Sequence, residues 1–184
     1  MRRIKKKFFQ FWFWLFGWKI IGEVPIEKKF LIIVAPHTSN IDFFVGLAAR
    51  SIVGLRSDFL GKKSLFTAPI IGAFMKSVGG HPVDRSKNTN IVDQVVELYK
   101  QHDEFVLTLA PEGTRSYVPK WKTGFYHIAH KAQVPIAVVG FDYARKVVDF
   151  NGLFHTTGHM EKDIEKLLEY YRTIKGKIPE NATR

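Results

Sequence analysis

Residues 30–44 read FLIIVAPHTSNIDFF, an apolar run followed by a proline, a histidine, three small polar residues and an aspartate. The apolar run predicts a buried strand over residues 30–36, and the residues after the polar stretch predict a helix over 41–53. A histidine that ends a buried strand is a candidate for chemistry. The same pattern also fits an ordinary strand-to-helix turn, so the stretch alone leaves both readings open.

The spacing of His37 and Asp42 limits where they can lie. Two side chains five residues apart on one continuous helix would point about 140° away from each other. A histidine and an aspartate that act together at this spacing therefore need His37 in the turn before the helix and Asp42 in its first turn. Pro36, Ser39 and Asn40 suit such a break and cap.

The rest of the chain continues the alternation of strands and helices. Further strands are expected at 57–61, 81–84, 105–110 and 134–141, with 147–150 pairing beside the last of these through a turn. Helices are expected at 65–78, from Thr89 to about 102, around 125–132, and at 164–174. This order predicts an α/β fold with a mixed, mostly parallel sheet flanked by helices.

The composition bounds the function. The chain has 184 residues, no cysteine and a formal net charge of +11, and a chain of this length is expected to form one domain. Disulfides, thiolate zinc sites and a cysteine nucleophile are excluded. The charge favours an anionic partner: nucleic acid, a phosphate-bearing substrate or an anionic membrane.

The amino terminus favours a membrane among these partners. Five basic residues precede a run rich in phenylalanine and tryptophan that ends at Trp18. The run is too short and too aromatic to span a bilayer, whereas these residue types suit the headgroup region. We expect residues 1–22 to be a membrane-associating segment with an interfacial helix, residues 23–174 the main domain, and 175–184 a polar tail. The alternative is that the aromatic residues pack on the protein's own core.

Two further stretches combine glycine, a carboxylate and an arginine. They are GGHPVDRS at 79–86 and LAPEGTRS at 109–116, the second at the end of an expected strand. Ligands bind beyond the carboxyl ends of strands in open α/β sheets. His37 and Glu112 are therefore expected on one edge of the sheet, where they would supply a general base, a carboxylate and cations for a phosphate.

These blocks occur in an order that resembles the glycerolipid acyltransferases, which include the lysophosphatidic acid acyltransferases. The blocks are His37-x4-Asp42, Gly80 to Arg85, Glu112-Gly113-Thr114-Arg115 and Val134-Pro135-Ile136, and the resemblance covers about residues 25–145. The family pattern has asparagine before the histidine, where this chain has Pro36.

The resemblance implies transfer of an acyl group from a thioester to a lysophospholipid hydroxyl, with 1-acylglycerol-3-phosphate as the first acceptor. His37 would be the general base and Asp42 would orient it. The substrate-binding residues implied are Lys62, Arg85, Glu112, Gly113, Thr114 and Arg115. Glu112 would position the acceptor or hold Arg115, and the surroundings of Gly113 would stabilise the oxyanion.

The expected partners follow from this chemistry. The donor is acyl-CoA or acyl-carrier protein, no bound cofactor or metal is expected, and the protein would lie on the cytoplasmic face of an anionic membrane as a peripheral, monotopic enzyme. Nucleic acid is not expected, because no recognisable binding module is present. A nucleotide-binding loop at the sequence GKKS is rejected because Arg56 replaces its first glycine. Another acceptor, such as a different lysophospholipid, glycerol phosphate or an aminolipid, and a non-catalytic membrane protein remain as alternatives.

Overall fold

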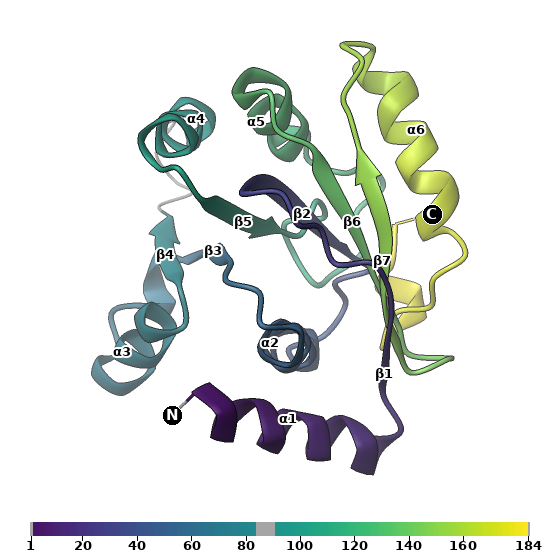
Figure 1. Cartoon of the computed structure of the whole chain (residues 1–184). Coiled ribbons are helices and arrows are strands. Elements are labelled where there is room, and N and C mark those ends of the chain that lie inside the picture. The colour runs from purple at the N-terminus through teal and green to yellow at the C-terminus, as the bar shows by residue number, and fades with distance from the viewer. Residues whose placement is uncertain (1, 84–90, 184) are drawn as a thin grey trace.

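A seven-stranded sheet in the order β1-β7-β6-β2-β5-β3-β4 lies at the centre of the computed structural model, which describes residues 2–83 and 91–183 (Figure 1). Its strands are β1 (Lys19–Gly22), β2 (Lys29–Ala35), β3 (Asp58–Lys62), β4 (Gly80–Val83), β5 (Phe105–Leu109), β6 (Ile136–Asp142) and β7 (Val147–Phe154). The helices are α1 (Arg2–Phe16), α2 (Ile41–Val53), α3 (Pro69–Ser77), α4 (Ile91–Gln101), α5 (Gly124–Ala132) and α6 (Met160–Tyr171), with short 3-10 turns η1 (Lys63–Leu65) and η2 (Pro179–Asn181).

The sheet is mixed and mostly parallel, as the sequence predicts. Strand β2 lies between β5 and β6 and is parallel to both, and β3 and β4 continue the parallel part. Strand β7 runs antiparallel to β6, and β1 is parallel to β7. The carboxyl ends of β2, β5 and β3 therefore meet at one edge of the sheet.

Helices cover both faces of the sheet. Figure 1 shows α4, α5 and α6 on one side, and α1, α2 and α3 on the other. Strand β2 supplies both cores, because alternate side chains of a strand point to opposite faces. Leu31 and Ile33 lie in the core under α4, α5 and α6, whereas Phe30 and Ile32 lie in the core under α2.

Most predicted elements are present, with shifted ends. Helix α2 has the predicted bounds. The helix expected at 65–78 begins only at Pro69, because proline is favoured at the first helical position and a 3-10 turn precedes it. Thr89, the expected cap of α4, lies outside the described residues. Strand β1 was not predicted from the sequence.

Helix α1 has a buried side and an exposed side. Phe13 is buried in the core under α2, and Phe9 and Trp12 pack partly against the same core. Large apolar side chains also point outward: Phe8, Phe11, Trp14, Leu15 and Phe16. The packing expected as the alternative is therefore present on one face of the helix, and the other face leaves large apolar side chains exposed. Within residues 2–83 and 91–183, none of the helices has the length and apolar character needed to cross a bilayer.

The carboxyl-terminal segment, expected as a polar tail, lies against the turn that carries His37. Ile174 is buried. The Ile178 amide donates a hydrogen bond to Thr38 Oγ1 over 3.1 Å, and Thr183 Oγ1 donates to the Val118 carbonyl over 3.0 Å. These contacts are single hydrogen bonds spread along an irregular segment. Because such a segment has no hydrophobic periodicity, the sequence does not indicate them.

Candidate active site

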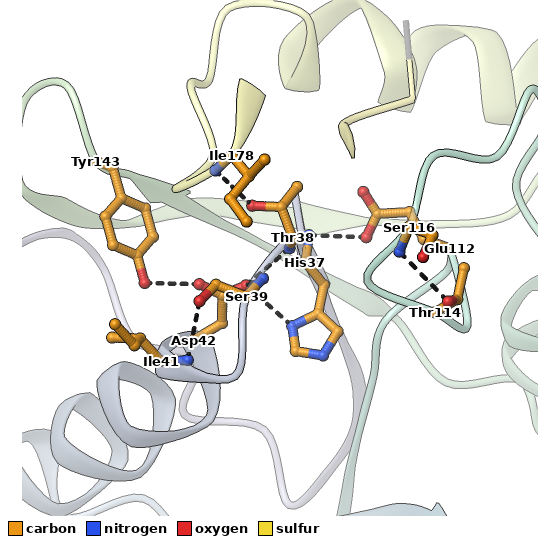
Figure 2. Close-up of polar contacts among 10 residues, drawn as sticks. All are labelled: His37, Thr38, Ser39, Ile41, Asp42, Glu112, Thr114, Ser116, Tyr143 and Ile178. Atoms are coloured by element: carbon orange, nitrogen blue, oxygen red, sulfur yellow. Dashed lines mark hydrogen bonds and ion pairs between the residues drawn. The ribbon is translucent and has the colours of Figure 1, made fainter. Parts of the chain in front are cut away.

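The sheet places His37 beside Glu112. Strands β2 and β5 are parallel neighbours, and the two residues follow their carboxyl ends. The His37 amide donates a hydrogen bond to Glu112 Oε2 over 2.8 Å (Figure 2). Two residues 75 positions apart in the chain are thus joined at the sheet edge where the sequence places a ligand.

The turn between β2 and α2 brings His37 to Asp42. His37 lies before the helix, and Asp42 is the second residue of α2. His37 Nδ1 lies 3.2 Å from Asp42 Oδ2. The same oxygen accepts hydrogen bonds from the amides of Thr38 and Ser39, each over 2.8 Å. Asn40 makes no side-chain cap, so the Asp42 carboxylate itself ties the turn to the first turn of the helix.

Tyr143 holds the other oxygen of this carboxylate and was not found from the sequence. Its hydroxyl donates to Asp42 Oδ1 over 2.6 Å, and burial together with this hydrogen bond raises the pKa of the phenol. The ring lies edge-on to Trp18, with centroids 5.0 Å apart, and Lys177 Nζ lies 5.6 Å from its centroid. No local motif marks Tyr143, because only the pairing of β6 with β2 brings it to Asp42.

The carboxyl group of Glu112 is buried, with 2% of the residue exposed. Burial raises its pKa from 4.5 to about 7; the hydrogen bond from His37 acts in the opposite direction, and nearby Asp42 adds to the rise. Arg115 is exposed, and among the described residues Glu112 contacts the His37 amide rather than pairing with Arg115. The observed contact therefore supports the backbone of the turn that carries His37.

The loop after β5 presents the remaining residues of the Glu112–Arg115 block. Gly113 has φ +65°, a left-handed conformation that favours glycine, and a Cβ there would lie 2.9 Å from Lys122 Cδ. The Gly113 amide donates to the Ala110 carbonyl over 3.0 Å. Thr114 Oγ1 accepts a hydrogen bond from the Ser116 amide over 3.3 Å. The Gly113 amide is thus already engaged, and Lys122, which the sequence did not indicate, is the cation that lies beside this glycine.

Of the two other expected cationic residues, the structure places only Lys62, on the β3 side of the sheet. Lys62 ends β3 and is exposed, and β3 is the neighbour of β5. Lys62 is in register with Val83 of β4. Arg85 follows Val83 by two residues and lies outside the described residues, so the structure does not place it.

The other histidines serve different contacts. His130 Nδ1 lies 3.0 Å from Thr156 Oγ1, and the His130 ring stacks on the ring of Tyr126. His127, His155 and His159 are exposed. Across the described part of the chain, no group of three histidine or carboxylate side chains is arranged to hold a metal ion.

The geometry defines a class of chemistry. His37 is 23% exposed at its side chain, and Asp42 is 1% exposed. The carboxylate fixes Nδ1, and Nε2 lies on the opposite side of the ring, away from Asp42 (Figure 2). A histidine oriented in this way by a buried carboxylate suits general-base activation of a hydroxyl. The fold and site together are those of an α/β protein with a histidine–aspartate dyad at the carboxyl edge of its sheet.

Comparison with known proteins places this chain in a family. The family model described as Acyltransferase matches residues 18–142, and the chain therefore belongs to the acyltransferase family. It is 32% identical over 175 residues to the 1-acyl-sn-glycerol-3-phosphate acyltransferase of Saccharomyces cerevisiae, covering 90% of this chain and 56% of the yeast protein. The Escherichia coli protein of the same name is 30% identical over 148 residues, covering 76% of this chain and 59% of its own length.

A solved structure shares the fold. The crystal structure of the 1-acyl-sn-glycerophosphate acyltransferase PlsC from Thermotoga maritima aligns with a TM-score of 0.64 and 18% identity, covering 94% of this chain and 77% of the other. The chain spans only a little over half the length of the yeast and E. coli relatives.

Proposed function

We propose that this protein transfers a fatty acyl group from an acyl thioester to the free hydroxyl of a lysophospholipid in phospholipid synthesis, with 1-acylglycerol-3-phosphate as the preferred acceptor. The observation that carries the proposal is the His37–Asp42 pair, 3.2 Å apart at the carboxyl edge of the sheet. The names of the yeast and E. coli relatives supply the acceptor.

The dyad accounts for the chemistry without a nucleophile from the protein. Nε2 of neutral His37 removes the proton of the acceptor hydroxyl as its oxygen attacks the thioester carbonyl. The tetrahedral intermediate collapses, the carbon–sulfur bond breaks, and the thiolate takes the proton from His37. Asp42 keeps Nδ1 protonated and the ring oriented, while the amides of Thr38 and Ser39 and the Tyr143 hydroxyl hold the carboxylate in place.

The acceptor phosphate is proposed to bind the cations at the same edge of the sheet. Arg115 and Lys62 are exposed near the ends of β5 and β3, and Arg85 follows β4 in the sequence. Arginine forks bind phosphate oxygens in a bidentate manner. Thr114 adds a hydroxyl to the same loop. Lys122 beside Gly113 is a candidate for stabilising the oxyanion, because the Gly113 amide is engaged with Ala110.

The protein is proposed to work as a peripheral, monotopic enzyme on the cytoplasmic face of the membrane. The outward side of α1 carries Phe11 and Trp14, which are 58% and 73% exposed, and Lys6 and Lys7 are exposed beside them. Each basic residue near an anionic surface contributes about 1 kcal/mol, and burial of the aromatic area adds about 25 cal/mol per Å². The acceptor would reach the site from the leaflet that holds its acyl tail.

Product analysis with the purified chain tests the function. Acyl-CoA and acyl-carrier protein are each offered with vesicles that contain 1-acylglycerol-3-phosphate, other lysophospholipids or an aminolipid, and with soluble glycerol phosphate. Mass spectrometry is expected to find diacylglycerol phosphate as the dominant product. A dominant product from another acceptor would overturn the acceptor assignment, and no acyl transfer from either donor to any acceptor would overturn the enzymatic one.

A further inference from the structure

Exposed large apolar side chains are concentrated on one side of the sheet. Besides those of α1, this side carries Ile41 and Phe44 of α2, Leu65 of η1, and Ile70, Ile71 and Phe74 of α3. Among the residues that the structure describes, α4, α5 and α6 contribute none. Those three helices cover the opposite side (Figure 1), so among the helices the asymmetry follows the two faces of the sheet. The remaining exposed large apolar residues, Ile21, Ile26 and Tyr117, lie in β1 and in loops.

Helix α3 contributes an unusually apolar outer surface. Ile70 is 86% exposed, Ile71 is 53% exposed and Phe74 is 44% exposed. Ile70 and Ile71 precede Phe74 by four and three positions, so the three side chains share one face of the helix. Gly72 and Met75 are buried on the other side. The helix is thus apolar toward the protein and also toward the outside, which requires another apolar medium to cover it.

The charges around α3 identify that medium. The sequence has no aspartate or glutamate between Asp58 and Asp84. In that interval Lys62, Lys63 and Lys76 are all exposed. The charged residues of this interval are all lysine, and an apolar helix face with such a charge excess matches an anionic leaflet, in which acyl chains lie beneath negatively charged headgroups. A protein surface that covered the patch would need no such excess of one charge.

We propose that α3, together with Leu65 of η1, is a second membrane-contacting element, whose occupant is the leaflet of an anionic bilayer. Ile70, Ile71 and Phe74 enter the headgroup–acyl boundary, and the neighbouring lysines contact the headgroups. The inference rests on the proposed membrane location of α1 and extends it from one contact to two, both on the same side of the sheet.

Two contacts fix the orientation of the active site in a way that one cannot. A protein held by α1 alone can rotate about that helix, whereas α1 and α3 define a plane. The start of α2 is on the same side, where exposed Ile41 directly precedes Asp42. The catalytic turn then faces the leaflet that contains the acceptor, so the lipid need not leave the bilayer completely.

Single-cysteine labelling tests the contact, because the chain has no cysteine of its own. Ile70→Cys of the full chain is labelled with an environment-sensitive fluorophore and mixed with vesicles of phosphatidylcholine and phosphatidylglycerol that carry doxyl-labelled acyl chains. Ile26→Cys is the matched control, since Ile26 is 96% exposed and lies outside the three helices of this side. Ile71→Cys repeats the measurement, and circular dichroism checks that each labelled protein is folded.

The proposal expects a blue shift and doxyl quenching at positions 70 and 71, and neither at 26. It also expects the double variant Ile70→Ser, Ile71→Ser to partition into the same vesicles about tenfold or more weakly than the wild type. Ile26→Ser should partition as the wild type does. Unquenched fluorescence at 70 and 71 with the protein bound to vesicles would overturn it. A blue shift that grows with protein concentration without vesicles would assign the patch to a second copy instead. None of these readouts uses acyl transfer, so their failure is distinct from failure of the proposed activity.

Discussion

The buried carboxyl group of Glu112 should make the protein less stable as the pH rises. Burial raises its pKa from 4.5 to about 7 in the folded state. Between those values the folded protein binds more protons at this group than the unfolded chain does. Each increase in pH across the interval therefore favours unfolding, and the penalty is complete above about pH 7.

The size of the effect follows from the shift. One pKa unit corresponds to about 1.4 kcal/mol, so a rise from 4.5 to about 7 corresponds to a loss of about 3 kcal/mol at most. Glu112→Gln removes the titration but keeps an oxygen that can accept the hydrogen bond from the His37 amide. We expect the free energy of unfolding of the variant, relative to the wild type, to rise by up to about 3 kcal/mol between pH 4.5 and 8.

Urea unfolding followed by circular dichroism measures this difference at several pH values. Glu161→Gln, at an exposed position of α6, controls for the loss of a carboxylate as such. The free energy of unfolding is plotted against pH for the wild type and for Glu112→Gln. If the difference between the two proteins stays constant from pH 4.5 to 8, Glu112 does not titrate in the folded protein as its burial requires.

Five further substitutions probe the site and its surroundings. Tyr143→Phe should lower kcat about tenfold with little change in KM, because it removes a hydrogen bond to the charged Asp42 carboxylate. Steady-state kinetics over a range of pH measure this, and an unchanged kcat at every pH would contradict the role of Tyr143 in holding Asp42. Arg115→Ala and Arg85→Ala should each raise KM about tenfold for a phosphate-bearing acceptor and leave KM for the donor unchanged, and an unchanged acceptor KM in both would place the phosphate elsewhere. Phe13→Ala should lower the free energy of unfolding in urea by about 3–5 kcal/mol, because Phe13 is buried. Trp14→Ser should reduce vesicle flotation without lowering that free energy. Identical effects of the two substitutions would contradict the assignment of a buried and an exposed side to α1.

The sequence predicted the geometry of the turn between β2 and α2 well because its information is local. The apolar run before His37 and the polar residues after it specify a strand, a break and a helix, and α2 has the predicted bounds. The meeting of His37 with Glu112 could also be predicted, because parallel strands end at one edge.

The contacts that the sequence did not predict depend on pairing over long separations. Tyr143 is 101 residues from Asp42, and Ile178 is 140 residues from Thr38. Strand β1 pairs with β7, and its four residues carry no alternating pattern. The amino-terminal aromatic run showed which residue types were present, but only the packing of α1 on α2 shows which of them point inward.

The rate of acyl transfer by His37→Ala tests the central claim most directly. Purified wild type and variant are compared with the donor and acceptor that the wild type uses best, and product is quantified by mass spectrometry after circular dichroism has shown that the variant is folded. If Nε2 of His37 removes the proton of the acceptor hydroxyl, the variant should be slower by about 10²-fold or more. A folded variant that transfers acyl groups at nearly the wild-type rate would contradict the assignment of His37 as the general base.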